Sequence, residues 1–131
     1  MIVGHIRRLH RRIEKRWPDT AIIAWCEANE VDYVFGLTGN RTLHADPVID
    51  TAADVACVDR TVRAQPVLRR YAETRYAAKS WADIASANDR RLVARIKATS
   101  LGLDIRFVVT SLKSGSTEHI YDTLYCARGQ A

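Results

Sequence analysis

Residues 104–131 read DIRFVVTSLKSGSTEHIYDTLYCARGQA, and this stretch decides the fold class. Its first part, residues 105–112, is rich in β-branched and aromatic side chains, which predicts a largely buried strand. Ser114-Gly115 then breaks the strand, and Ser116 can cap a helix. The helix is indicated by side chains that recur at helical spacing before Arg128, namely Ile120, Tyr121, Leu124 and Tyr125. A strand followed directly by a helix predicts an α/β protein.

Two upstream segments predict further strands of the same sheet. Residues 31–37 alternate, with Val31, Tyr33, Phe35 and Leu37 on one face. Residues 92–98 also alternate, with Arg95 and Lys97 on the polar side. Leu101-Gly102 can turn this second segment back onto residues 105–112 as an antiparallel hairpin. We therefore expect one mixed sheet that contains both residues 31–37 and residues 105–112.

Helical patterns predict the elements that flank this sheet. A helix is expected over residues 4–17, and a short one over residues 21–29. Asp46 is a good N-cap for a helical pattern over residues 47–70, which is interrupted at Pro66. The expected apolar face of this helix consists of Val48, Val55, Val58 and Val62. The predicted fold class is α/β, a mixed sheet flanked by helices, with the helices over residues 4–17 and 116–128 against it.

The composition limits the classes of protein to consider. The chain has 131 residues, of which 47% are hydrophobic, and this is enough for a core and argues against disorder. Twenty Lys and Arg against fifteen Asp and Glu give a net charge of +5, which favours a polyanionic partner. Cys26, Cys57 and Cys126 lie far apart, so neither a zinc site nor a disulfide framework is predicted, and a reducing cytoplasm fits. No stretch resembles a membrane span or a signal peptide.

The predicted helix over residues 4–17 is basic as well as amphipathic. Its polar side carries six cations, Arg7, Arg8, Arg11, Arg12, Lys15 and Arg16. These side chains can follow DNA phosphates, and binding of that kind is salt-dependent. The alternative is the solvated outer face of a helix that packs on a sheet. A loop over residues 38–41 can likewise bring Arg41 to a phosphate, and its alternative is a plain turn.

Several blocks of the sequence resemble a known family. RRIEKRWPDT, AWCEANEVDYVFGLTGNRTL and the stretch 104–131 occur in the order found in DDE transposases of bacterial insertion sequences, specifically the family numbered thirteen-eighty, in DDE group one. Tyr125 and Arg128 resemble the start of the signature on the last catalytic helix of that family. The resemblance implies part of an RNase H-like catalytic domain with a β-rich insertion over residues 1–131, and Tyr125 and Arg128 become candidate DNA contacts.

The chain also departs from the family pattern. In the relatives a further strand, which ends in the second catalytic aspartate, lies between the first two blocks, whereas here Thr20 is followed directly by Ala21. The first aspartate is expected upstream of the residues seen here, and the catalytic glutamate just past Ala131. Asp19 and Asp32 do not occupy matching motifs. The intact family uses Mg²⁺ held by these three carboxylates, so no catalytic residue, metal ligand or cofactor is predicted in this fragment.

The predicted function follows from the resemblance and the departure together. We expect a truncated and internally deleted fragment of a DDE transposase that does not catalyse transposition. Its partner would be transposon-end DNA, bound weakly and electrostatically, with no membrane partner and an oligomeric state left open. Two alternatives remain, a small basic nucleic-acid-binding module and a product without function. The predicted DNA contacts are Arg7, Arg8, Arg11, Arg12, Lys15, Arg16, Arg41, Tyr125 and Arg128.

Overall fold

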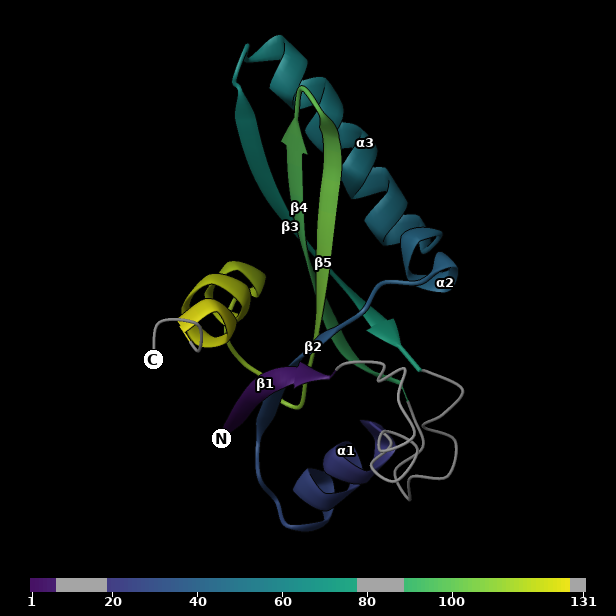
Figure 1. Ribbon diagram of the computed structural model, residues 1–131, viewed down its shortest axis with the longest axis vertical. Coiled ribbons are helices and arrows are strands. Elements are labelled where there is room, and N and C mark those ends of the chain that lie inside the picture. Colours follow the sequence, from purple (N-terminus) through teal and green to yellow (C-terminus); the bar gives the residue numbers. More distant parts are fainter. Residues whose placement is uncertain (7–18, 78–88, 128–131) are drawn as a thin grey trace.

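The computed structural model describes residues 1–6, 19–77 and 89–127. Their five strands form one mixed sheet in the order β1-β2-β5-β4-β3, with helices on both faces (Figure 1). The α/β class is therefore confirmed. The strands are β1 (Ile2–Ile6), β2 (Tyr33–Leu37), β3 (Val67–Tyr76), β4 (Arg90–Thr99) and β5 (Gly102–Thr110). The helices are α1 (Asp19–Ala28), α2 (Arg41–His44), α3 (Pro47–Val62) and the π-helical segment η3 (His119–Tyr125).

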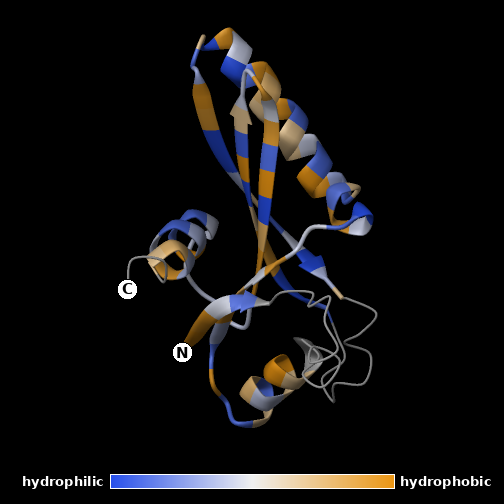
Figure 2. Cartoon of the chain, viewed as in Figure 1, coloured by the Kyte–Doolittle hydropathy of each residue, from blue (hydrophilic) through white to orange (hydrophobic). Residues whose placement is uncertain are grey.

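The two predicted strands at the centre of the sheet are confirmed. β2 lies beside β5 in antiparallel register, with Val34 opposite Thr110 and Leu37 opposite Phe107. The predicted hairpin is also confirmed, because β4 and β5 pair antiparallel up to Thr99. Gly102 closes this hairpin with a φ of 124°, a left-handed conformation that glycine adopts without steric cost. Figure 2 shows polar and apolar residues alternating along these long strands.

The N-terminal prediction was wrong for its first residues. Gly4 to Ile6 belong to β1, which pairs in parallel with β2 from Ile2 opposite Tyr33 to Ile6 opposite Leu37. The helical spacing there is outweighed by backbone pairing along the otherwise open edge of β2, and Val3 packs beside Val34. The rest of the predicted helix, with its six cations, falls within residues 7–18, outside the described residues.

Helix α3 begins where it was predicted but ends earlier. Asp46 is its N-cap and accepts a hydrogen bond from the backbone N–H of Val48 at 2.9 Å. The helix ends at Val62, and residues 67–70 form the start of β3 instead of more helix. The predicted apolar face was also wrong, because the buried residues are Ile49, Ala53 and Ala56. These alanines let the helix approach the sheet closely, whereas the four valines lie exposed on another side.

The hydrophobic core fills both faces of the sheet. On one face α3 packs on β3 and β4 through its small buried residues, and Leu92 and Ile96 of β4 lie beneath them. At the lower end in Figure 1, Ile23 and Cys26 of α1 pack on β2. On the opposite face η3 covers strands β1, β2 and β4. This arrangement leaves the outer part of the hairpin covered by α3 on one face only.

The C-terminal helix confirms the predicted capping residue. The Ser116 hydroxyl accepts a hydrogen bond from the backbone N–H of His119 at 3.1 Å. Ile120, Tyr121 and Tyr125 of η3 are buried against the sheet. A Cβ at Gly36 of β2 would collide with the Tyr125 hydroxyl, so glycine is what allows this helix to lie so close to the strand.

Candidate nucleic-acid interface

The predicted DNA contacts lie in three different places. Arg7, Arg8, Arg11, Arg12, Lys15, Arg16 and Arg128 fall outside the described residues. Arg41 is exposed as the first residue of α2, directly after Asn40, whose side chain caps that short helix. Tyr125 is only 9% exposed, and its hydroxyl lies 3.1 Å from Nδ1 of His5. α2 and η3 lie on opposite sides of the sheet (Figure 1), so Arg41 and Tyr125 do not form one surface.

A cluster of cations that the sequence analysis did not select lies on the face of the sheet that η3 partly covers. We call this cluster the basic face. Strand pairing brings its members together, because residues directly opposite each other in antiparallel strands share a face. Arg69 of β3 lies opposite Lys97 of β4. Two residues further along β4, Arg95 lies opposite Arg106 of β5. Three adjacent strands thus supply the basic face, which consists of Arg69, Arg95, Lys97 and Arg106.

The arrangement of the basic face has an electrostatic cost. Like charges directly opposite each other on neighbouring strands repel and destabilise the sheet. The basic face contains two such pairs, and Asp104 lies beside them, opposite Lys97 in the register. An anion bound over this face would relieve the repulsion. The surface is therefore suited to a polyanion.

Arg95 is the fixed centre of the basic face. It is 8% exposed and donates a hydrogen bond from its guanidinium to the Asp104 carboxylate at 2.8 Å. Its guanidinium also lies 5.5 Å from the centre of the Tyr121 ring, a cation–π contact. The hydrogen bond from Arg95 lowers the pKa of Asp104 below its usual value. Asp104 accepts a second hydrogen bond from Arg106 at 3.3 Å, so it offsets both arginines in part.

The remaining cations of the basic face are more accessible. The Arg106 side chain is 65% exposed, and Arg69 is exposed on β3. Lys97 is partly exposed between them. Within the described part of the chain, neither Arg69 nor Lys97 forms an ion pair with an acid. These side chains are available to phosphates, whereas Arg95 is buried beside them.

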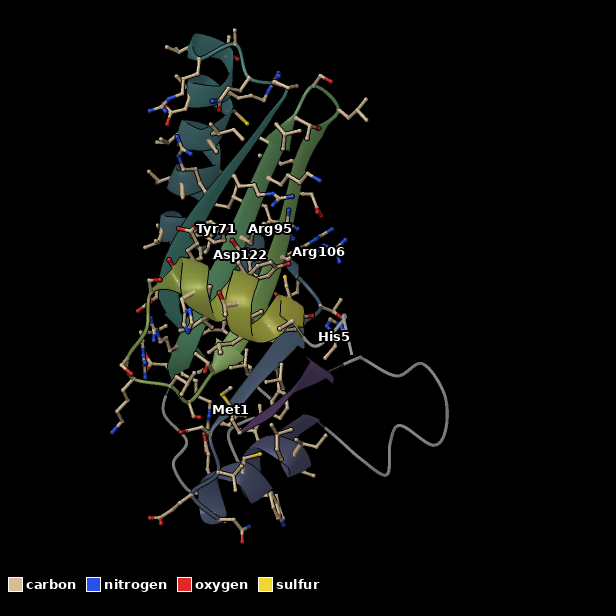
Figure 3. The ribbon with its side chains drawn as sticks, turned by 90° about the vertical axis from the view of Figure 1, so that its left-hand side faces the viewer. Met1, His5, Tyr71, Arg95, Arg106 and Asp122 are labelled. Atoms are coloured by element: carbon tan, nitrogen blue, oxygen red, sulfur yellow. The ribbon has the colours of Figure 1, made fainter. Side chains whose placement is uncertain are left out.

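A tyrosine and an aspartate join η3 to the edge of the basic face. The Tyr71 hydroxyl of β3 donates a hydrogen bond to Asp122 of η3 at 2.5 Å. Burial, together with this bond, raises the pKa of Tyr71 above its usual value, so the hydroxyl keeps its proton. Figure 3 shows Tyr71, Asp122, Arg95 and Arg106 along the upper side of η3, with His5 below its right-hand end. The bond holds η3 over the lower part of the face and leaves Lys97 uncovered.

Two acids in the described part of the chain, Glu27 and Glu73, are bound to arginines. Glu27 receives two hydrogen bonds from Arg90, both at 2.8 Å. Glu73 receives two from Arg91, at 2.9 and 2.7 Å. Among residues 1–6, 19–77 and 89–127, no three His, Cys, Asp or Glu side chains lie close enough together to hold a metal ion. The residues of these three ranges therefore do not fit the pair of Mg²⁺ ions that DDE chemistry requires.

The sequence contained a partial signal for the basic face. Arg95 and Lys97 already stand on the polar side of an alternating segment, but the residues opposite them come from β3 and β5 and depend on register. Residues 67–70 were predicted as helix, so Arg69 was not recognised as a strand residue on this face.

No helix in the described ranges is both long and apolar enough to cross a membrane.

Comparison with known proteins identifies the family. The family described as transposase DDE domain group 1 matches residues 1–131. No curated protein and no solved structure matches the chain. The resemblance of the sequence blocks to DDE transposases is thus confirmed at the level of the domain, and with it a general role in transposition and an association with DNA. Because the match spans the whole chain, this protein belongs to the transposase DDE domain group 1 family.

Proposed function

We propose that this chain binds the phosphate backbone of DNA through the basic face, as part of an insertion-sequence transposase of the family numbered thirteen-eighty. The observation that carries the proposal is the pairing of cation with cation, Arg69 with Lys97 and Arg95 with Arg106, across three adjacent strands. Such pairs weaken an isolated sheet and are stabilised by a bound polyanion. Membership of a transposase family identifies the expected polyanion as DNA, because transposases act on DNA. A cytoplasmic location, where such DNA is met, belongs to the same proposal.

The basic face favours contact with the backbone over recognition of bases. Its cations come from the strands of a sheet and not from a helix that could enter a groove. Phosphate contacts fix position without sequence information. Each contact releases counterions, so log K falls with log salt with a slope of about −0.9 per phosphate neutralised. We therefore expect weak, salt-sensitive binding with little sequence preference.

Fluorescence anisotropy of a labelled duplex, titrated at about 50 mM and about 200 mM salt, tests this proposal. Lys97→Gln and Arg106→Gln each remove one accessible cation without disturbing the buried Arg95. Each is expected to weaken binding and to reduce the slope of log K against log salt by about 1. A duplex of unrelated sequence should bind equally well.

A matched control uses a cation outside the basic face. Arg63 is exposed at the C-cap of α3, on the far side of the sheet, and forms no ion pair with a described residue. Arg63→Gln changes the net charge by the same amount as Lys97→Gln. Because Arg63 lies outside the basic face, its replacement should leave the slope of log K against log salt unchanged. Equal losses in all variants would assign the binding to net charge alone and would refute a localised basic face.

We further propose that the chain does not cut or join DNA by itself. Two divalent ions held close together require converging carboxylates, and no three acids, histidines or cysteines of the described residues converge in this way. The second catalytic aspartate of the relatives would fall in the deletion between Thr20 and Ala21. Purified chain, labelled transposon-end DNA and Mg²⁺ or Mn²⁺ on a denaturing gel should yield no product. Ion-dependent cleavage that co-purifies with the chain through every column would overturn this proposal.

The internal deletion is consistent with the position of β1. β1, α1 and β2 form a parallel strand pair with a helix in the crossover, the arrangement expected when a strand precedes α1. We propose that β1 occupies the place that the catalytic strand of an RNase H-like domain takes in the relatives. It ends in His5 and Ile6, not in an aspartate, so the fold is preserved on that edge while the metal ligand is lost.

A further inference from the structure

β3 ends the sheet with an open edge. It is the last strand in the sheet order and is ten residues long, and no other described strand pairs with its outer side. An edge of this length presents a row of backbone donors and acceptors that can pair with another strand. Natural proteins often shorten such an edge or pair it, whereas β3 has ten residues and no described strand on that side. β3 is therefore a candidate surface for pairing with another chain.

The exposed side of α3 carries a stripe of valines. Val48, Val55 and Val62 recur every seven residues, and Val58 falls between the last two. This is the spacing of a and d positions in packed helices, where valine is favoured at a. The exposed fraction of these side chains rises from 48% at Val48 to 78% at Val62. We call these residues the valine stripe, and none of them belongs to a hydrophobic cluster of the described residues.

The valine stripe faces the same side as the open edge. Asp59 of α3 lies 3.5 Å from Arg70 of β3. At 3.6 residues per turn, Asp59 stands on the helix surface between the buried face and the valine stripe. The valine stripe therefore lies on the β3 side of the helix, facing away from β4 and toward the open edge. One partner can cover both surfaces at once.

We propose that this partner is a second copy of the chain, paired antiparallel through β3 with the two valine stripes in contact. A two-fold axis through Tyr71 places each Arg69 opposite Glu73 of the second copy. Glu73 accepts both hydrogen bonds from Arg91 on Oε1, so its Oε2 stays available to Arg69. This interaction would give Arg69, which has no acid partner among the described residues, an opposite charge.

Neighbouring registers place like charges together. An axis one residue later, through Ala72, sets Arg69 opposite Arg75. An axis through Glu73 sets that residue against itself, and an axis through Arg70 does the same for arginine. Because directly opposite like charges repel, the register centred on Tyr71 is favoured.

The dimensions also suit two copies. α3 packs on β3 and β4, so its axis lies about one strand spacing from the two-fold axis. Two such spacings come to roughly 10 Å, close to the 8 to 10 Å between packed helices. Pairing the edges therefore brings the two α3 helices to contact distance. The two sheets become one, and the two basic faces lie on the same side. This inference goes beyond the proposed DNA binding and does not depend on it.

Light scattering coupled to gel filtration tests the dimer on the full chain. The native chain is expected at twice its 14.8 kDa mass. Val55→Glu/Val62→Glu puts charge on side chains that are already exposed, so each copy should fold and elute as a monomer. Leu101→Glu is the matched control, since Leu101 is 97% exposed at the hairpin turn and belongs neither to β3 nor to the valine stripe, so this variant should remain dimeric. Circular dichroism checks that all three chains are folded.

Disulfide trapping tests the register. With exposed Cys57 and Cys126 replaced by Ser, Tyr71→Cys should cross-link to itself under mild oxidation. Residues opposite each other in an antiparallel pair have Cα atoms roughly 4.5 to 5.5 Å apart, within the range of a disulfide. Arg75→Cys should not cross-link, because two copies of position 75 would be roughly 27 Å apart. A monomeric native chain over the whole concentration range measured would overturn the proposal. So would a dimer that survives Val55→Glu/Val62→Glu, or equal cross-linking at positions 71 and 75.

Discussion

Removal of Arg90, the arginine that joins α1 to β4, should destabilise the protein strongly. Arg90 has a side chain that is 6% exposed, and it donates two hydrogen bonds of 2.8 Å to the Glu27 carboxylate. The Tyr33 hydroxyl donates a third hydrogen bond to the same carboxylate at 2.9 Å. Arg90→Met keeps the length of the side chain and removes both arginine bonds. The Glu27 charge then stays in a largely desolvated position.

The size of the effect follows from burial. Breaking a fully buried ion pair by removing one partner costs about 3 to 5 kcal/mol. Glu27 keeps 23% of its side chain exposed and retains the hydrogen bond from Tyr33, so water and the hydroxyl recover part of this cost. We expect Arg90→Met to lower the free energy of unfolding by about 2 to 3 kcal/mol. For a domain with about 5 to 15 kcal/mol of stability, this is a large fraction.

Urea unfolding followed by circular dichroism measures this loss, and a double-mutant cycle separates the pair from packing. Glu27→Gln should destabilise by a similar amount, and Glu27→Gln/Arg90→Met by clearly less than the sum, since no charge is then left buried. Arg75→Met is the matched control. Its pair with Asp89 is more than half exposed on both sides and is expected to contribute under about 1 kcal/mol. Additive losses, or an Arg90→Met change no larger than that of Arg75→Met, would refute the argument.

Three further predictions concern local contacts and pH. Gly36→Ala places a Cβ against the Tyr125 hydroxyl and should cost about 1 to 3 kcal/mol of unfolding free energy in urea melts, whereas Gly4→Ala, which has room for a Cβ, is the control. The lowered pKa of Asp104 means that its stabilising effect is present above about pH 4 and is lost as the pH falls through the lower folded-state value. Asp104→Asn should therefore be less stable than the native chain at pH 7, and the difference should shrink in acid melts. The pKa of Tyr33 is raised by burial and by Glu27, so protonated Tyr33 stabilises the fold below about pH 10, and the effect is lost at higher pH. Tyr33→Phe should flatten the alkaline fall in melting temperature, and an unchanged pH profile would contradict this cause.

Local signals in the sequence were sufficient for several elements. The strand over residues 105–112 and its hairpin partner were predicted because alternation and a glycine turn act over few residues. Asp46 and Ser116 were correctly expected as caps, since capping depends on the next three residues only. The family was recognised for the same reason, because its sequence blocks can be identified without knowing how the strands pair.

The tertiary structure decided which surfaces are covered. α3 has two apolar sides, and only its position on β3 and β4 determines that Ile49, Ala53 and Ala56 are buried while the valine stripe is exposed. Likewise, Gly4 to Ile6 form β1 because β2 offers an edge to pair with. Neither outcome is encoded in periodicity, because burial depends on which other element arrives at a given side.

The sequence by itself determined that the chain is a basic α/β member of a transposase family, with strands and helix starts placed by short-range patterns. Only the tertiary structure decided which of its cations lie next to each other on the basic face. Arg69, Lys97 and Arg106 come from three different strands, and the register of these strands makes them neighbours. A register is set by packing summed over whole strands, so a candidate interface built across strands emerges only once the sheet has formed.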